Sequence, residues 1–170
     1  MIGLLDSVTV TNPETGVTWT ILGIRTDRGD RSRAKQNAED ALTNHPDMAG
    51  MVGLWAYNPP TILQAVRDVN KVGQVRIVGF DENAVTLEAI VAGEIVGTVV
   101  QNPYEFGFRS VEYLSAQVRG QSFDIPANKM MYIPVRTITA DNIQDFRSLT
   151  ESIQSGNGPI PAYDEGAYDT

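Results

Sequence analysis

The sequence predicts an α/β protein with a doubly wound, mainly parallel sheet and helices on both faces. Between positions 19 and 120, short β-branched runs alternate with helical patterns at a repeat of roughly 20 residues, which is typical of βα units. The β-branched runs are apolar almost throughout, as in strands that are buried on both faces. The chain has 170 residues, 42% of them hydrophobic, which is enough for one buried core.

The predicted strands are the runs richest in Val and Ile. In chain order they are residues 18–24, 51–56, 75–80 and 95–100. Residues 130–139 form one more strand, interrupted by Pro134 because proline has no amide N–H for a sheet ladder. Helical patterns separate the first four runs, so we expect parallel strands joined by right-handed crossovers.

The predicted helices begin at capping or proline residues. The first covers about 31–44, with Asp30 as N-cap and Pro46 after its end. The second begins at Pro59, with Asn58 as N-cap, and the third covers roughly 84–92. The fourth runs from position 103 towards 120, and a short fifth helix covers 141–153.

The two ends of the chain differ from this pattern. Residues 1–8 resemble the last turns of a helix, and the Gly-, Pro- and acid-rich residues 155–170 predict a disordered tail. The expected division is therefore a ligand-binding domain at 1–140 that is incomplete at its start, a short helix at 141–154, and a tail at 155–170. The start lacks the basic residues and apolar run of a signal peptide, so we expect either a cytoplasmic chain or one whose true N-terminus is missing.

Composition argues against several functions. The formal net charge of -8 disfavours nucleic acid and anionic membranes as partners, and no stretch approaches the ~18 apolar residues of a membrane span. There is no cysteine, and His45 is the single histidine, so the sequence lacks the residues that zinc sites and Ser-His-Asp triads usually require. Glycine-rich nucleotide-binding motifs are also missing. We therefore expect no catalytic residue, no metal and no cofactor.

Three polar side chains stand just after predicted strands. Asn58, Asp81 and Gln101 are each one βα unit apart, so parallel strands bring them to the same edge of the sheet. An ionised aspartate accepts hydrogen bonds from neighbouring hydroxyls, and Asn and Gln amides both donate and accept. The set predicts a binding site for a polyol such as a sugar.

Other roles for these residues stay open. Asn58 and Asn102 precede proline-started helices and Asp81 precedes the third helix, so each is also a candidate N-cap. Trp55 and Tyr57 are candidates to stack on a sugar, or to pack against a helix as alternating strand residues.

Four stretches together resemble a known family. They are the run from Gly29 through Asp47, the segment Trp55-Ala56-Tyr57-Asn58, the segment Gly79-Phe80-Asp81, and the segment from Thr98 to Pro103. The sequence is similar to the ribose-type periplasmic sugar-binding proteins of ABC transporters, over about residues 20–139. The resemblance implies one C-terminal lobe of a type I periplasmic binding protein, with Asn58, Asp81 and Gln101 as the sugar contacts.

The resemblance also implies a partner and a location. A family member delivers a small-molecule sugar to an ABC permease from the periplasm, and it closes a second lobe over the ligand. Two family features are missing here: Gly29 stands where an aromatic residue often precedes the Asp-Arg pair, and an arginine contact from earlier in the lobe has no counterpart.

Two alternatives share this sheet architecture. The effector-binding domain of a lactose-repressor-type transcription regulator has the same fold, and it predicts a helix-turn-helix upstream. A receiver-like phosphoacceptor domain would use a strand-end aspartate such as Asp81, but it also needs an acidic cluster after an early strand and a lysine after a late one. Lys71 lies at the end of a helix, so this alternative is disfavoured.

Overall fold

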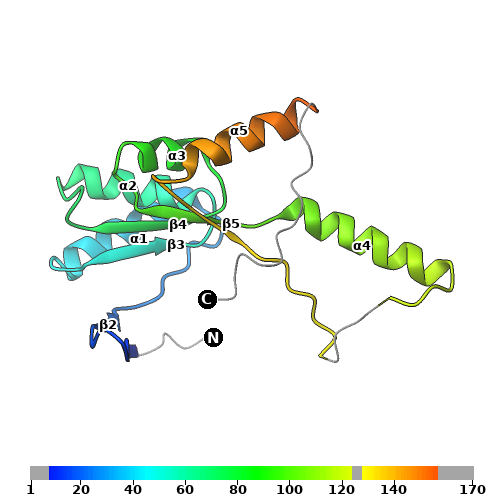
Figure 1. The fold of residues 1–170 in the computed structure, drawn as a ribbon. Helices are drawn as coiled ribbons and strands as arrows, with labels where there is room; N and C mark the ends of the chain where they lie inside the picture. The colour runs from blue at the N-terminus through cyan, green and yellow to red at the C-terminus, as the bar shows by residue number, and fades with distance from the viewer. Residues whose placement is uncertain (1–7, 124–127, 157–170) are drawn as a thin grey trace.

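The main sheet has the strand order β3-β4-β5-β6. The computed structural model describes residues 8–123 and 128–156. Strands β3 (Gly50–Gly53), β4 (Arg76–Phe80) and β5 (Gly97–Val100) are parallel, and β6 (Arg136–Thr139) runs antiparallel beside β5 (Figure 1). This arrangement confirms the predicted α/β class and the mainly parallel sheet flanked by helices.

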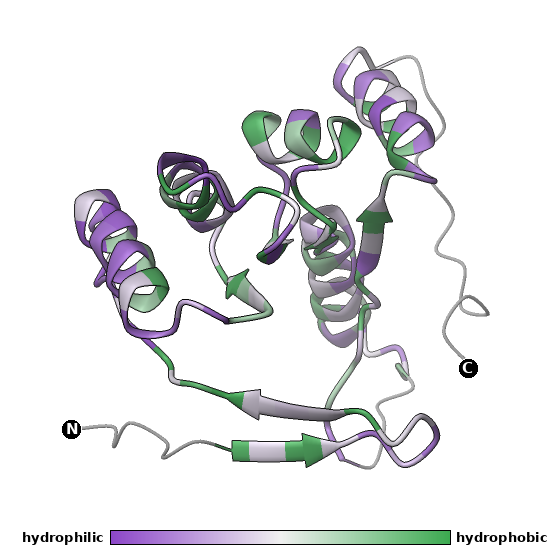
Figure 2. Cartoon of the chain, turned by 90° about the vertical axis from the view of Figure 1, so that its left-hand side faces the viewer, coloured by the Kyte–Doolittle hydropathy of each residue, from purple (hydrophilic) through white to green (hydrophobic). Residues whose placement is uncertain are grey.

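Helix α1 (Arg31–Asn44) has the bounds that its cap predicts, because the Asp30 carboxylate accepts hydrogen bonds from the amides of Ser32 (2.8 Å) and Arg33 (3.2 Å). The other helices are α2 (Asn58–Asp68), α3 (Ala84–Val91), α4 (Pro103–Val118) and α5 (Ile143–Gln154). The strand order advances in one direction from β3 to β5, so right-handed crossovers place α2 and α3 on the same face. Figure 2 shows α1, α2, α3 and α5 in an arc along that face.

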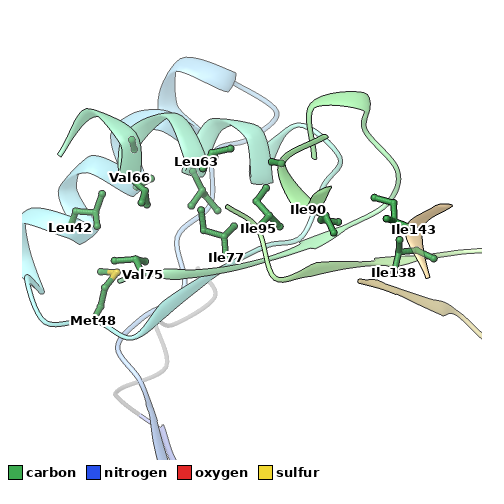
Figure 3. Close-up of a cluster of buried hydrophobic side chains, with 14 of the residues drawn as sticks. Leu42, Met48, Leu63, Val66, Val75, Ile77, Ile90, Ile95, Ile138 and Ile143 are labelled. Carbon is green, nitrogen blue, oxygen red and sulfur yellow. The ribbon is translucent and has the colours of Figure 1, made fainter. Parts of the chain in front are cut away.

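One apolar core lies between these helices and the sheet. Leu63 from α2, Ile90 from α3 and Ile77 of β4 belong to it, and each of these side chains is at most 1% exposed (Figure 3). Close approach of α2 requires glycine on two strands. A Cβ atom would lie 2.9 Å from the Pro59 nitrogen at Gly53 and 2.8 Å from the Pro59 Cγ at Gly79. These glycines therefore seat the first turn of α2 on the carboxyl ends of β3 and β4.

Helix α4 extends beyond the strand ends, away from this core (Figure 1). Its apolar stripe is exposed, with Val111 at 67%, Leu114 at 58% and Val118 at 88%. Among the described elements, none forms an extensive packing interface with α4. Side chains on this helix therefore contribute little to the core.

The N-terminal segment corrects two predictions. Strand β1 (Val8–Thr11) pairs antiparallel with β2 (Thr18–Ile21) in a separate hairpin. The run at 18–24 was expected in the main sheet, and this prediction is wrong because β2 pairs only with β1. The segment 1–8 was expected to be helical, and this prediction is wrong at Val8, which begins β1. The turn explains the hairpin, because the Asn12 side chain accepts from two turn amides and Gly16 has a φ of 69°. Residues 1–7 lie outside the described part of the chain.

Several predicted strands are shorter in the structure. β3 ends at Gly53 rather than at residue 56, because the chain turns there into α2. β6 begins at Arg136, after Pro134, whereas the run at 130–139 was predicted as one strand. The predicted tail falls at 157–170 outside the described residues. Across the part of the chain that the structure describes, no helix combines the length and apolar character needed to cross a bilayer.

Candidate ligand-binding rim

The carboxyl ends of β3, β4 and β5 meet at one edge of the sheet. The register pairs Gly53 with Gly79, and Phe80 with Val99, so the segments after these strands leave the sheet side by side. Asn58, Asp81 and Gln101 all belong to these segments. We call this set the rim.

Asp81 and Gln101 are in direct contact. The Gln101 side-chain nitrogen donates to one carboxylate oxygen of Asp81 at 2.9 Å. The Asp81 backbone is fixed from two sides, because its N–H donates to the Val99 carbonyl (2.8 Å) and its carbonyl accepts from the Thr98 hydroxyl (2.8 Å). Asp81 has a φ of 62°, a left-handed conformation that aspartate tolerates better than most residues do. The strand ends thus hold a half-exposed carboxylate in a defined place.

Asn58 lies at the same edge, as the first residue of α2. A Cβ atom on Gly53 would be 3.0 Å from the Asn58 Cβ, so Asn58 rests against the end of β3. The prediction that Asn58 caps α2 is wrong, because no side chain caps this helix. The Asn58 side chain instead contributes to the lowered pKa of Asp27, in the loop before α1. Among the described contacts, none joins Asn58 directly to Asp81 or Gln101.

The capping alternatives have different outcomes. Asn83 caps α3, accepting from the Val85 amide at 3.0 Å, so the alternative that Asp81 is this cap is wrong. Asn102 does cap α4, accepting from the Glu105 amide at 3.2 Å. The carboxylate of Asp81 is therefore not used in holding a helix end.

Sequence reasoning missed Asp27 and the hydroxyl of Tyr57. The Tyr57 hydroxyl donates to an Asp27 oxygen at 2.7 Å, and the Gly29 amide donates to the same oxygen at 2.8 Å. These donors, together with the Asn58 side chain, lower the pKa of Asp27 below its ordinary 3.8, with Tyr57 as the largest cause. The same hydrogen bond raises the pKa of Tyr57 above 10.0. The local sequence offers no signal for this contact, since it joins residues 30 positions apart.

Trp55 and Tyr57 are not alternating strand residues, because β3 has already ended at Gly53. Tyr57 is half-buried and lies under the Arg31 guanidinium, 5.8 Å from the ring centroid. Trp55 is 65% exposed, with its ring centroid 6.3 Å from that of Tyr57. A solvent-facing indole therefore lies three positions before Asn58, between β3 and α2.

The pKa of Asp27 leads to a prediction on pH dependence. Its native pKa lies below the unfolded value, so its contribution to stability is present above about pH 4 and is lost as the pH falls through the native pKa. In Tyr57→Phe the strongest donor is removed, so the Asp27 midpoint should rise towards 3.8. Carboxyl ¹³C NMR titration measures this shift. Asp68, whose pKa is lowered by Lys35, should titrate equally in both proteins. An Asp27 midpoint that is the same in both proteins would contradict the assigned cause.

An open α/β sheet with polar side chains at its carboxyl edge is the architecture of a ligand-binding lobe. Within 8–123 and 128–156, the structure brings together no group of three or more His, Asp or Glu side chains suited to a metal. Residues 12–122 match the family described as periplasmic binding protein domain, and the chain belongs to that family. Its architecture is that of one lobe of a type I member of this family.

Solved structures show the same fold. A glucose-galactose binding protein from Geobacillus stearothermophilus is 27% identical, with a TM-score of 0.60 over 67% of this chain and 39% of that one. An arabinose binding protein from the same organism is 25% identical, with a TM-score of 0.60 over 72% of this chain and 43% of that one. An ABC transporter solute binding protein from Actinobacillus succinogenes, with bound D-allose, is 17% identical (TM-score 0.59; 68% and 40%) and supports the fold alone.

The chain thus spans about two fifths of the length of these structures, 39% to 43%. A search of curated proteins gives no match.

Proposed function

We propose that the rim forms one side of a monosaccharide-binding site, in the solute-binding component of an ABC sugar transporter. Asn58, Asp81 and Gln101 are the proposed ligand contacts. The observation that carries the proposal is the Asp81–Gln101 pair, a fixed carboxylate and a carboxamide at the carboxyl edge of the sheet with one described hydrogen bond between them. The glucose-galactose binding protein and the arabinose binding protein named above support a sugar as the ligand class.

The chemistry of the rim suits a neutral polyol. An ionised carboxylate only accepts hydrogen bonds. Gln101 donates one hydrogen bond to Asp81, and the remaining lone pairs of the carboxylate can accept hydrogen bonds from ligand hydroxyls. Trp55 offers an exposed ring for the C–H face of a sugar. A formal net charge of -8 disfavours anionic ligands. Binding by these groups needs no acid–base pair, metal or cofactor, and we propose a binding protein rather than an enzyme.

The proposed setting follows from the family. A periplasmic location and delivery to an ABC permease are both proposals for the whole protein, of which this chain spans a part. A second lobe closing over the rim would supply the remaining contacts and exclude water. Affinity of this chain alone is therefore expected to be low, with a Kd in the millimolar range, on the order of -4 kcal/mol.

Nuclear magnetic resonance tests the proposal at such affinities. Isotope-labelled chain is titrated with D-glucose, D-galactose, D-allose and arabinose. We expect at least one sugar to shift the signals of Asn58, Asp81 and Gln101 in a saturable way, with the Leu114 methyl groups on α4 as an internal control. If none of the four sugars moves a rim signal more than the Leu114 signals, the proposed function is wrong.

A further inference from the structure

Strand β6 is the last strand of the main sheet, and none of the described strands lies beyond it. It pairs antiparallel with β5, and successive residues of such a strand direct their N–H and C=O groups alternately to its two sides. The Ile138 carbonyl is directed towards β5, since it would lie 2.6 Å from a Cβ atom on Gly97. The backbone groups of Thr137 and Thr139 are therefore on the outer side of β6.

A side chain of the same protein occupies this outer side. The Thr139 N–H donates to the side-chain oxygen of Asn142 at 2.9 Å, and the Asn142 side-chain nitrogen donates to the Thr137 carbonyl at 2.9 Å. One residue of a parallel neighbouring strand would make the same pair of contacts, accepting from one residue and donating to the residue two positions earlier. The orientation of the amide is determined, because a backbone N–H only donates and a carbonyl only accepts.

The position of Asn142 is fixed by its neighbours in the chain. Its backbone N–H donates to the Thr139 carbonyl at 3.3 Å, which closes a turn between β6 and α5. The next residue, Ile143, is 1% exposed and belongs to the core. The Asn142 side chain makes no capping bond to α5, so both ends of its amide are used on β6.

Space remains beside the outer side of β6. A cavity of about 250 Å³ lies between β6 and α5, with Phe146 and Leu149 on the α5 side and Asn142 in its lining. A strand edge with free N–H and C=O groups is a template for pairing with another chain. The contacts of Asn142 therefore cover the backbone groups that an added strand would need.

We infer that Asn142 closes the β6 edge to strand addition, as a one-residue substitute for a neighbouring strand. The partner that it excludes is a second copy of this chain, because the β6 edges of two copies can pair antiparallel about a two-fold axis. Thr137 of one copy would then lie opposite Thr139 of the other, and the groups that Asn142 occupies would form the intermolecular hydrogen bonds. This inference concerns self-association and does not depend on a sugar ligand.

The test measures amide hydrogen exchange of Thr139 by NMR at low and high protein concentration, together with sedimentation velocity. Asn142→Ala removes both side-chain bonds, whereas Asn142→Asp keeps an acceptor for the Thr139 N–H and adds a charge to the edge. The matched control is Asn83→Ala. Asn83 also makes a local side-chain bond, accepting from the Val85 amide at 3.0 Å, but it caps α3 in the loop after β4.

We expect Thr139 exchange in dilute Asn142→Ala to be about fivefold faster than in wild type. Raising the concentration should slow this exchange again, and sedimentation should show more dimer than in wild type. Asn142→Asp should keep Thr139 protected and add no dimer, because its carboxylate still accepts and charge disfavours edge pairing. Asn83→Ala should match wild type in both readouts, and exchange in β3, the opposite edge strand, should be the same in all proteins.

Three results would overturn the inference. Unchanged Thr139 exchange in dilute Asn142→Ala would mean that Asn142 does not protect the edge. Faster exchange without concentration dependence or added dimer would mean that another feature keeps the edge closed. Equal dimerisation of Asn83→Ala would attribute association to lost stability. Circular dichroism checks folding; if Asn142→Ala does not fold, Asn142→Gly replaces it under the same criteria, because glycine is accepted before a helix and also lacks an amide side chain.

Discussion

Replacing Asp81 by alanine is expected to lower the affinity for the bound sugar by about 100-fold. The carboxylate is proposed to accept two ligand hydroxyls, and each hydrogen bond to a charged group contributes roughly 1.5–3 kcal/mol, so losing both costs about 3 kcal/mol. The substitution also removes the partner of the Gln101 amide, which donates to Asp81 at 2.9 Å. In this chain, where binding is weak, the loss should appear as the disappearance of a saturable titration.

Two further variants make this result interpretable. Asp81→Asn keeps the shape and the tolerance for a positive φ but removes the charge, and we expect a smaller loss of about tenfold. Glu82→Ala removes the neighbouring exposed carboxylate and should leave affinity unchanged. Thermal melts confirm that the variants are folded. Affinity of Asp81→Ala within threefold of wild type would remove Asp81 from the site.

Leu63→Ala is expected to lower the free energy of unfolding by about 3 kcal/mol. Leu63 is 1% exposed and points from α2 into the core above Ile77 (Figure 3), so truncation leaves a cavity that rigid neighbours fill only in part. Urea unfolding followed by circular dichroism measures the change. A domain of this kind is stable by only about 5–15 kcal/mol, so the loss is a large part of the total.

The control makes the same chemical change on another helix. Leu114 on α4 is 58% exposed, and Leu114→Ala should change the free energy of unfolding by less than about 0.5 kcal/mol. Equal effects of the two substitutions would show that the core is not where the structure places it.

Local signals predicted the helices well. Asp30 caps α1 as expected, and α1 begins at Arg31 and ends at Asn44, as predicted. Asn102 likewise caps α4. Capping acts within three residues of the chain, so it can be read from sequence without knowledge of the tertiary fold. The parallel order of β3, β4 and β5 followed in turn from the helices between them.

Features that depend on distant contacts were missed or misread. Asn58 looked like a cap from its position before Pro59, but it is the first residue of α2 and no side chain caps this helix. The bond from the Tyr57 hydroxyl to Asp27 joins residues 30 positions apart, which no local rule connects. The run at 18–24 looked like a sheet strand, although the alternation of Val and Thr at 8–11 and the turn at Asn12 were available signals for a hairpin. On the rim, sequence reasoning named the residues, and the bond between Asp81 and Gln101 came only from the structure.

The left-handed backbone of Asp81 has a consequence for protein engineering. A glycine at this position would adopt a φ of 62° without steric cost, and this relief offsets the extra freedom that glycine gives the unfolded chain, so the folded protein should tolerate the change. The same change would delete the carboxylate on which the proposed recognition depends. Selection for thermal tolerance alone that accepted this glycine would therefore remove the proposed ligand contact without any warning from a stability measurement.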